Sequence, residues 1–142
     1  MNKMIVKDAM TRNVITIDRN ATVLDACNKY REYKVGCLVV TDKSECVGIV
    51  TERDIIERTI CARRNPEETK VDDIMSSEIK TVHALDTIEK AVQIMKQNNI
   101  KKLPVLLNEE IVGIITVTDI ARMQQDTTKK PVDSWIEKEW GV

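Results

Sequence analysis

Phenylalanine is absent from this sequence, and only two tryptophans and two tyrosines are present. Isoleucine, valine, leucine and methionine must therefore fill the interior. The formal net charge is −1, so the sequence lacks the basic excess that is typical of nucleic-acid-binding proteins. No apolar run approaches the roughly 20 residues that a membrane-spanning helix needs, and the first ten residues, MNKMIVKDAM, are too short and too polar for a signal peptide. We therefore expect a cytoplasmic protein that binds neither nucleic acid nor membrane.

Closely spaced metal ligands are also missing. Cys27, Cys37, Cys46 and Cys61 are too far apart to form a CxxC pair, which argues against a zinc site. Their mostly apolar neighbours are typical of small buried side chains in a reducing compartment. The sequence leaves open a disulfide between two of them. The single histidine, His83, has no nucleophilic partner at a recognisable spacing, so the sequence predicts a protein that is not an enzyme.

An internal repeat is the main positive feature of the chain. Residues 6–56 align with residues 71–121 at a constant shift of 65, and no gap is needed. The heptapeptide GIVTERD (48–54) falls on GIITVTD (113–119), and VKDAM (6–10) falls on VDDIM (71–75). The matches concern apolar and turn residues, as expected of two segments with the same backbone. Two copies predict a closed pair of units.

Each copy predicts the element order β-α-β-β-α, which is an α+β fold. Short strands are expected around 14–17 and 79–82, and each is followed by a helix. Capping-box spacing marks the helix starts, at Thr22 with Asp25 and at Asp86 with Glu89. Apolar runs on either side of 42–45 and of 108–110 predict β-hairpins. A second helix is expected over 52–61 and over 117–125, and the two copies are expected to pack their sheets together.

We place the first repeat at 1–62, a linker at 63–70, the second repeat at 71–125 and a tail at 126–142. The linker sequence RRNPEET contains a proline and several charges that rule out a continuous helix. The tail carries Trp135 and Trp140, and Ile136 shares a helical face with Trp140. Three roles for the tail stay open, namely packing on its own dimer, binding a partner protein, and disorder.

The repeated pattern G-h-h-T-x-x-D, where h is an apolar residue, puts a threonine and an acid where a strand becomes a helix. Thr51 with Asp54, and Thr116 with Asp119, have the spacing of a capping box, which needs no ligand. A helix N-terminus also attracts anions, and a carboxylate there can accept hydrogen bonds from a ribose diol. The glycine gives a ligand room to approach the backbone. Both interpretations stay open on this evidence from the residues.

From about Val6 to Met123 the chain resembles a tandem pair of CBS domains, often called a Bateman module. The resemblance rests on the duplicated G-h-h-T-x-x-D signature, the β-α-β-β-α order, and the LPV (103–105) of the second predicted hairpin. It implies two repeats related by a pseudo-twofold axis, and regulatory binding of AMP, ADP, ATP or S-adenosylmethionine in clefts between them. It also implies a homodimer, and no catalytic cofactor.

The contacts of the family, carried over residue by residue, imply two candidate clefts. In the first, Asp119 would accept hydrogen bonds from the ribose hydroxyls, with Thr116 and Thr118 near the ribose and the phosphate. Lys101 and Lys102 stand where the family often has basic residues that meet phosphates, and the alternative is that they are ordinary solvated lysines. The apolar wall for the adenine would come from Thr11, Val14, Ile15, Val35 and Gly36.

In the second implied cleft, Asp54, Thr51 and Arg53 would take the corresponding roles. Its wall would come from Ser76, Ile79, Lys80 and Ile100. The positions that match the lysine pair are here Gly36 and Cys37, which carry no charge, although Arg53 could partly compensate. The resemblance therefore predicts that the cleft at Asp119 is the stronger nucleotide site.

We therefore predict a stand-alone sensor that binds an adenosine-containing ligand and signals to an unknown effector protein through a population shift. Two alternatives stay open. One is a scaffold protein that uses the fold for dimerisation and binds no ligand. The other is a small hydrolase that uses Asp54 or Asp119, which no nucleophile–base pair or metal cluster in the sequence supports.

Overall fold

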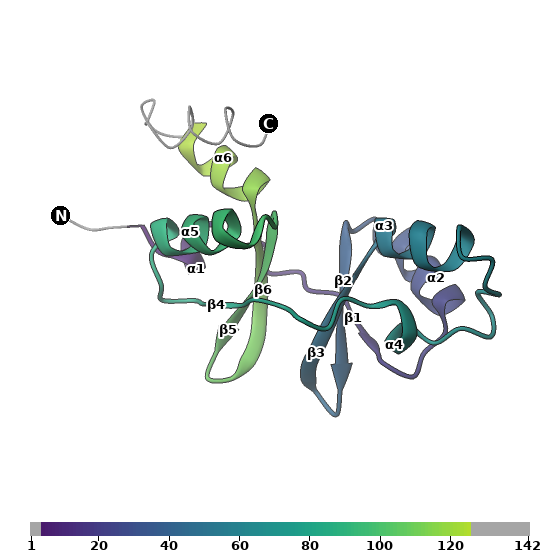
Figure 1. The fold of residues 1–142 in the computed structure, drawn as a ribbon. Coiled ribbons are helices and arrows are strands. Elements are labelled where there is room, and N and C mark those ends of the chain that lie inside the picture. The colour runs from purple at the N-terminus through teal and green to yellow at the C-terminus, as the bar shows by residue number, and fades with distance from the viewer. Residues whose placement is uncertain (1–3, 126–142) are drawn as a thin grey trace. The chain divides into compact units, whose positions relative to one another are not determined.

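The computed structural model of this protein describes residues 4–125, which form two compact units. We call Val14–Ile79 the Asp54 unit, and residues 4–13 with 80–125 the Asp119 unit. Each unit has its own three-stranded sheet and its own helices (Figure 1), so the predicted α+β class is confirmed. The predicted tail 126–142, with Trp135 and Trp140, lies outside the described residues.

The Asp54 unit has one sheet with the strand order β1-β2-β3. Strand β1 runs parallel to β2, and β2 and β3 form an antiparallel hairpin. The elements follow the chain as β1 (Thr16–Asp18), α2 (Val23–Tyr33), β2 (Cys37–Asp42), β3 (Glu45–Thr51), α3 (Glu52–Ile55), the π-helical turn η1 (Ile56–Ile60) and α4 (Val71–Ile74).

The Asp119 unit repeats this arrangement, with the strand order β4-β5-β6 and the same parallel and antiparallel pairings. The order β-α-β-β-α predicted for each copy is therefore confirmed. The elements of this unit are α1 (Val6–Ala9), β4 (Val82–His83), α5 (Ile88–Asn98), β5 (Lys102–Leu107), β6 (Glu110–Thr116) and α6 (Val117–Gln125).

Both predicted hairpins form, and each closes with a two-residue turn. Lys43 and Ser44 have φ angles of 51° and 72°, and Asn108 and Glu109 have φ angles of 53° and 67°. Two successive left-handed residues are what a two-residue hairpin loop of type I′ requires. Each hairpin also has a register irregularity at the same place, between Val40 and Thr41 and between Val105 and Leu106.

The start of α2 is predicted correctly, and the start of α5 is not. The Thr22 hydroxyl accepts from the Asp25 N–H at 3.1 Å, and the Asp25 carboxylate accepts from the Thr22 N–H at 3.0 Å. In α5 the N-cap is Thr87, whose hydroxyl accepts from the N–H three residues later at 3.2 Å. Asp86 instead accepts from the His83 N–H at 2.9 Å. Thr87 is the residue that the 65-residue shift aligns with Thr22, so the repeat locates this helix start better than local spacing does.

The helix predicted over 52–61 is divided between α3 and η1. In η1 the N–H of Cys61 donates to the carbonyl of Ile56 at 2.8 Å, five residues back. This wider turn is the π-helical spacing. The helix predicted over 117–125 is confirmed as α6. The predicted strands are displaced, because β1 begins at Thr16 and β4 begins at Val82.

The boundaries of the compact units differ from those of the sequence repeats. Residues 4–13 belong to the Asp119 unit, although they begin the first repeat, and the segment 63–79 belongs to the Asp54 unit. In Figure 1, α1 lies beside α5, and the N–H of Val6 donates to the carbonyl of Asp86 at 2.8 Å. The N–H of Val71 in α4 likewise donates to the carbonyl of Ala21 at 2.8 Å. The first segment of each repeat, 4–13 or 71–79, therefore packs in the unit of the other repeat. We call these two stretches the lent segments.

The predicted linker packs on the start of α2. The carbonyl of Thr69 accepts from the N–H of Val23 at 2.8 Å, and that of Pro66 accepts from the N–H of Leu24 at 3.0 Å. These are among the first N–H groups of a helix, which have no partner inside the helix. The boundaries 1–62, 63–70 and 71–125 stay a prediction about the sequence copies.

Each unit encloses its own aliphatic core, and the lent segment contributes to it. In the Asp54 unit the buried cluster is Ile17, Val23, Ala26, Leu38, Val40, Val50, Ile55, Val71 and Ile74. In the Asp119 unit it is Val6, Val82, Ala84, Ile88, Ala91, Met95, Leu103, Val105, Ile115, Val117 and Ile120.

The glycine of the repeated pattern lies where the lent segment crosses the hairpin. A Cβ on Gly113 would lie 2.6 Å from Sδ of Met10 and 2.8 Å from the carbonyl oxygen of Thr11. The crossing is held by two backbone hydrogen bonds of 2.8 and 3.0 Å between Thr11 and Ile114. Gly48 meets Met75 and Ser76 in the same way. The neighbour that excludes a side chain here is therefore the chain itself, and not a ligand as the sequence had suggested.

We expect Gly113→Ala to lower the free energy of unfolding by about 1–3 kcal/mol, because a methyl group would overpack the crossing against backbone that cannot move away. Urea unfolding followed by circular dichroism measures the change. The control is Glu110→Ala, an exposed position of the same strand, where we expect a change within about 0.5 kcal/mol. Equal stability of the two variants would contradict this account of the glycine.

Candidate functional site

Asp119 holds the start of α6 in a capping box. Its Oδ2 accepts from the Thr116 N–H at 3.0 Å, and the Thr116 hydroxyl accepts from the Asp119 N–H at 3.0 Å. This is the pattern that satisfies N–H groups at a helix start. The capping interpretation of the pattern is therefore confirmed at Asp119. The carboxylate is deeply placed, with only 5% of the side chain exposed.

The same carboxylate also meets partners from outside its own turn. The Thr11 hydroxyl donates to Oδ1 at 3.1 Å and lies 3.3 Å from Oδ2, and Thr11 arrives with the lent segment. The guanidinium of Arg122 lies 3.6 Å from Oδ1. Asp119 is thus not occupied by local amides alone, because its second oxygen accepts a hydroxyl hydrogen bond.

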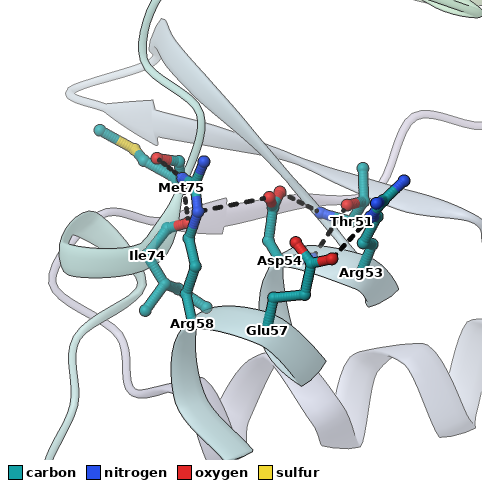
Figure 2. Close-up of polar contacts among 7 residues, drawn as sticks. All are labelled: Thr51, Arg53, Asp54, Glu57, Arg58, Ile74 and Met75. Atoms are coloured by element: carbon teal, nitrogen blue, oxygen red, sulfur yellow. Dashed lines mark hydrogen bonds and ion pairs between the residues drawn. The ribbon is translucent and has the colours of Figure 1, made fainter. Parts of the chain in front are cut away.

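Asp54 has the same capping role and a different outer partner. Its Oδ2 accepts from the Thr51 N–H at 2.9 Å, and the Thr51 hydroxyl accepts from the Asp54 N–H at 3.2 Å. Its Oδ1 lies 4.0 Å from Nε of Arg58, which is on η1. Figure 2 shows Arg58 between Asp54 and the end of α4, where its Nη1 donates to the carbonyls of Ile74 and Met75 at 3.1 and 3.2 Å.

The two copies therefore surround the same carboxylate with different chemistry. Ser76 stands in the place of Thr11, but within residues 4–125 its hydroxyl makes no hydrogen bond to Asp54. The residue that the repeat aligns with Arg58 is Met123, which has no charge. Each carboxylate thus has an arginine near Oδ1, with Arg122 at 3.6 Å from Asp119 and Arg58 at 4.0 Å from Asp54. Within the described residues, Asp119 also accepts a hydroxyl hydrogen bond from the lent segment, and of the two arginines only Arg58 is bound to carbonyls of a lent segment.

The residues predicted for the first cleft divide between the two units. In the Asp119 unit, Thr118 is exposed on α6, and exposed Lys101 precedes β5, where its carbonyl accepts from the Val117 N–H at 3.0 Å. Lys102 lies opposite Thr116 in the β5–β6 register. Together with Thr11, Thr116 and Asp119 they form one local group. The other four belong to the Asp54 unit, beside the starts of β1 and β2, and are Val14, Ile15, Val35 and Gly36.

Five residues predicted for the second cleft lie in the Asp54 unit. Arg53 is 82% exposed, and its Nε donates to a carboxylate oxygen of Glu57 at 2.9 Å. Ser76 pairs with Ile49 through two backbone hydrogen bonds of 2.9 and 3.0 Å, next to Gly48. The remaining members in this unit are Asp54, Thr51 and Ile79, and those in the Asp119 unit are Lys80 and Ile100.

The sequence analysis did not identify Arg58 and Arg122, although their spacing from the two aspartates predicts contact. Arg58 follows Asp54 by four residues, and Arg122 follows Asp119 by three. Side chains at these spacings meet on one face of a helix. The contact of Arg58 with the carbonyls of α4 had no such signal, because sequence does not show that α4 packs with the first repeat.

No disulfide joins the cysteines, all four of which lie in the described part of the chain. Burial raises the pKa of the Cys27 and Cys46 thiols, which favours the inert protonated form. Cys61 is exposed, so the prediction of buried side chains is wrong for it. Among residues 4–125 no group of three or more His, Cys, Asp or Glu side chains could hold a metal ion. No helix in the same range has the length and apolar character to span a bilayer.

Comparisons with known proteins point to one family. A family model described as "CBS domain" matches residues 6–60 and 71–126. The "CBS domain-containing protein YhcV" of Bacillus subtilis is 34% identical over 116 residues, which cover 82% of each chain. The "Uncharacterized protein MK0525" of Methanopyrus kandleri is 33% identical over 126 residues, which cover 87% of this chain and 64% of that protein. The chain thus spans less than two thirds of the Methanopyrus protein.

A solved structure supports the same fold. It is the CBS domain pair of protein MJ0100 in complex with 5′-methylthioadenosine and S-adenosyl-L-methionine. The TM-score is 0.78, and the match covers 88% of this chain and 98% of that chain. The sequences are 24% identical, so the likeness concerns the fold.

We expect Thr11→Ala to lower the free energy of unfolding by about 1–3 kcal/mol, because it removes a donor from a buried carboxylate. The matched control is Ser76→Ala, the aligned position without a hydroxyl bond to Asp54, where the expected change is within about 0.5 kcal/mol. Thr11→Ser should retain most of the stability. Urea unfolding of the three variants measures these values, and equal losses for Thr11→Ala and Ser76→Ala would refute the role of the Thr11 hydroxyl.

Proposed function

Because this chain belongs to the CBS domain family, we propose that it is a regulatory protein that binds an adenosine-containing ligand. The observation that carries the proposal is the state of the two repeated carboxylates. Each uses one oxygen to hold a helix start, and each turns the other oxygen toward a polar group from outside its motif. The MJ0100 pair, which has the same fold, was solved with two adenosine compounds. The proposed ligands are AMP, ADP, ATP and S-adenosylmethionine.

The site at Asp119 is the first proposed binding site. A ribose hydroxyl is the same kind of donor as the Thr11 hydroxyl, so it can replace that hydroxyl at Oδ1 of Asp119. The exchange keeps the buried carboxylate satisfied, which limits its cost. Exposed Lys101 and Thr118, with Lys102 and Thr116, are proposed to meet the ribose and the phosphate. The adenine wall predicted at Val14, Ile15, Val35 and Gly36 belongs to the Asp54 unit and stays a prediction from the sequence.

The site at Asp54 is the second proposed binding site. Asp54 is proposed to bind the ribose there, with Thr51 and Arg53 nearby. The pairing of Arg53 with Glu57 at 2.9 Å reduces its capacity to neutralise a phosphate. Because Gly36 and Cys37 supply no charge, we propose weaker binding here than at Asp119. Of the wall predicted for this site, Ser76 and Ile79 lie in the same unit as Asp54, and Lys80 and Ile100 stay a prediction from the sequence.

The proposed output is a population shift, and no catalysis. A ligand shifts an equilibrium only by its differential affinity for the two states, and a coupling of about 1–3 kcal/mol is typical. The response would pass to an effector protein, and we propose that the protein acts in the cytoplasm as a homodimer.

A scaffold protein without a ligand is the second candidate function. The observation that favours it is that the Asp119 carboxylate is already satisfied by Thr116 and Thr11, with 5% of the side chain exposed. Such a carboxylate can serve the fold alone. Ligand binding by the purified protein decides between the two functions.

We expect isothermal titration calorimetry to show binding of at least one of AMP, ATP and S-adenosylmethionine. Asp119→Asn should weaken that binding by about 10–100-fold, since the amide keeps one acceptor for the cap and loses an acceptor for the ribose. The matched control is Asp25→Asn, which makes the same change in the capping box of α2 and should leave the affinity unchanged. No heat with any of the three compounds, together with no rise in melting temperature, would favour the scaffold function.

A further inference from the structure

Arg58 is a guanidinium that the Asp54 unit holds at a fixed place. Its Nη1 donates to the carbonyls of Ile74 and Met75 at 3.1 and 3.2 Å. These carbonyls lie at the end of α4, where the last carbonyls of a helix have no partner inside the helix. Figure 2 shows the side chain extending from η1 toward this point. Two hydrogen bonds from one nitrogen restrict the orientation of the planar group, so the direction of its other edge is restricted as well.

The other edge of this guanidinium, formed by Nε and Nη2, is open to a ligand. Nε lies 4.0 Å from Oδ1 of Asp54, which is an ion-pair distance and too long for a hydrogen bond. Within residues 4–125, neither Nε nor Nη2 donates a hydrogen bond to a protein acceptor. The side chain is 52% exposed. An arginine edge with two parallel N–H groups matches two oxygens of a phosphate.

The other cations near Asp54 are less suitable. Arg53 is 82% exposed and already donates to Glu57 at 2.9 Å. The positions of the lysine pair are occupied by Gly36 and Cys37, which have no charge. Arg58 is therefore the cation that combines a fixed orientation, an open edge and a position beside the Asp54 carboxylate.

We propose that Arg58 determines the ligand specificity of the Asp54 site by binding the phosphate of a nucleotide whose ribose is bound by Asp54. This inference rests on the proposed function. The ribose and the phosphate are neighbours in one nucleotide, so an acceptor and a cation side by side suit both groups. S-adenosylmethionine suits the place less well, because it has no phosphate and its single carboxylate is accompanied by two cationic groups, the sulfonium and the ammonium, which leave it with a net positive charge beside Arg58. The site is thus selective for a phosphorylated adenosine.

The Asp119 unit has no equivalent of this anchored cation in its described residues. Met123 stands at the aligned position. Arg122 lies 3.6 Å from Asp119, its side chain is 68% exposed, and no carbonyl of the described chain holds it. Within the described residues, only the Asp54 site therefore has an anchored arginine that could select for a phosphate.

The test compares AMP with adenosine in the Asp119→Asn background, which reports on the Asp54 site. Isothermal titration calorimetry of the full chain should show that Arg58→Gln weakens AMP binding by about 10-fold and adenosine binding by less than about 2-fold. Arg58→Lys keeps the charge and loses the edge with two N–H groups. Its AMP affinity should therefore lie between that of the protein with Arg58 and that of the Arg58→Gln variant. The charge control is Arg64→Gln, an exposed position outside the site, which should change neither affinity.

Three results would overturn the role of Arg58. Equal losses for AMP and adenosine in Arg58→Gln mean that Arg58 only anchors α4, and unchanged AMP affinity means that it does not meet the phosphate. Absence of AMP binding in the Asp119→Asn background, while the unsubstituted protein binds AMP, means that the Asp54 site takes no nucleotide. If Arg58→Gln is unfolded by circular dichroism, the same comparison is made with Arg58→Lys. Failure of the proposed function is distinguishable, because the unsubstituted protein would then bind none of AMP, adenosine, ATP and S-adenosylmethionine.

Discussion

The crossing of each lent segment over a hairpin glycine is the contact on which the rest of the structure depends. At Gly113 the backbone of Thr11 approaches so closely that a Cβ would lie 2.8 Å from its carbonyl oxygen, and two backbone hydrogen bonds join Thr11 to Ile114. The crossing brings α1 onto the Asp119 unit, where Val6 is fully buried in the core. It also places the Thr11 hydroxyl on Asp119. One close backbone contact therefore connects the fold to the proposed site.

The two units show how one backbone can carry different side chains around the same carboxylate. Their strand orders, hairpin turns and capping boxes agree. The second oxygen of the repeated carboxylate nevertheless accepts from the Thr11 hydroxyl and lies near Arg122 at Asp119, whereas at Asp54 it lies near Arg58, which is held by the carbonyls of Ile74 and Met75. The aspartate of each capping box is needed to hold the start of its helix, so it cannot vary freely. The residues that approach its other oxygen from outside the capping box can each differ by a single side chain.

Much of the local structure was predictable because it depends on neighbours in the sequence. The capping boxes at Thr22, Thr51 and Thr116 follow from side chains that bond to backbone three residues away. The hairpins follow from apolar runs around short polar turns. The error at Asp86 has the same origin, since an acid with suitable spacing imitates a cap, and only the alignment with Thr22 points to Thr87.

By itself, the sequence determined that the chain contains two copies of one α+β unit, and that a threonine and an aspartate begin the last helix of each. These features depend on periodicity and on contacts over a few residues. Only the tertiary structure decided that residues 4–13 and 71–79 pack with the opposite repeat, that the glycines make room for that crossing, and that Arg58 binds the end of α4 beside Asp54. The physical reason is that such contacts join residues far apart in the chain, and their partners are selected by packing rather than by spacing.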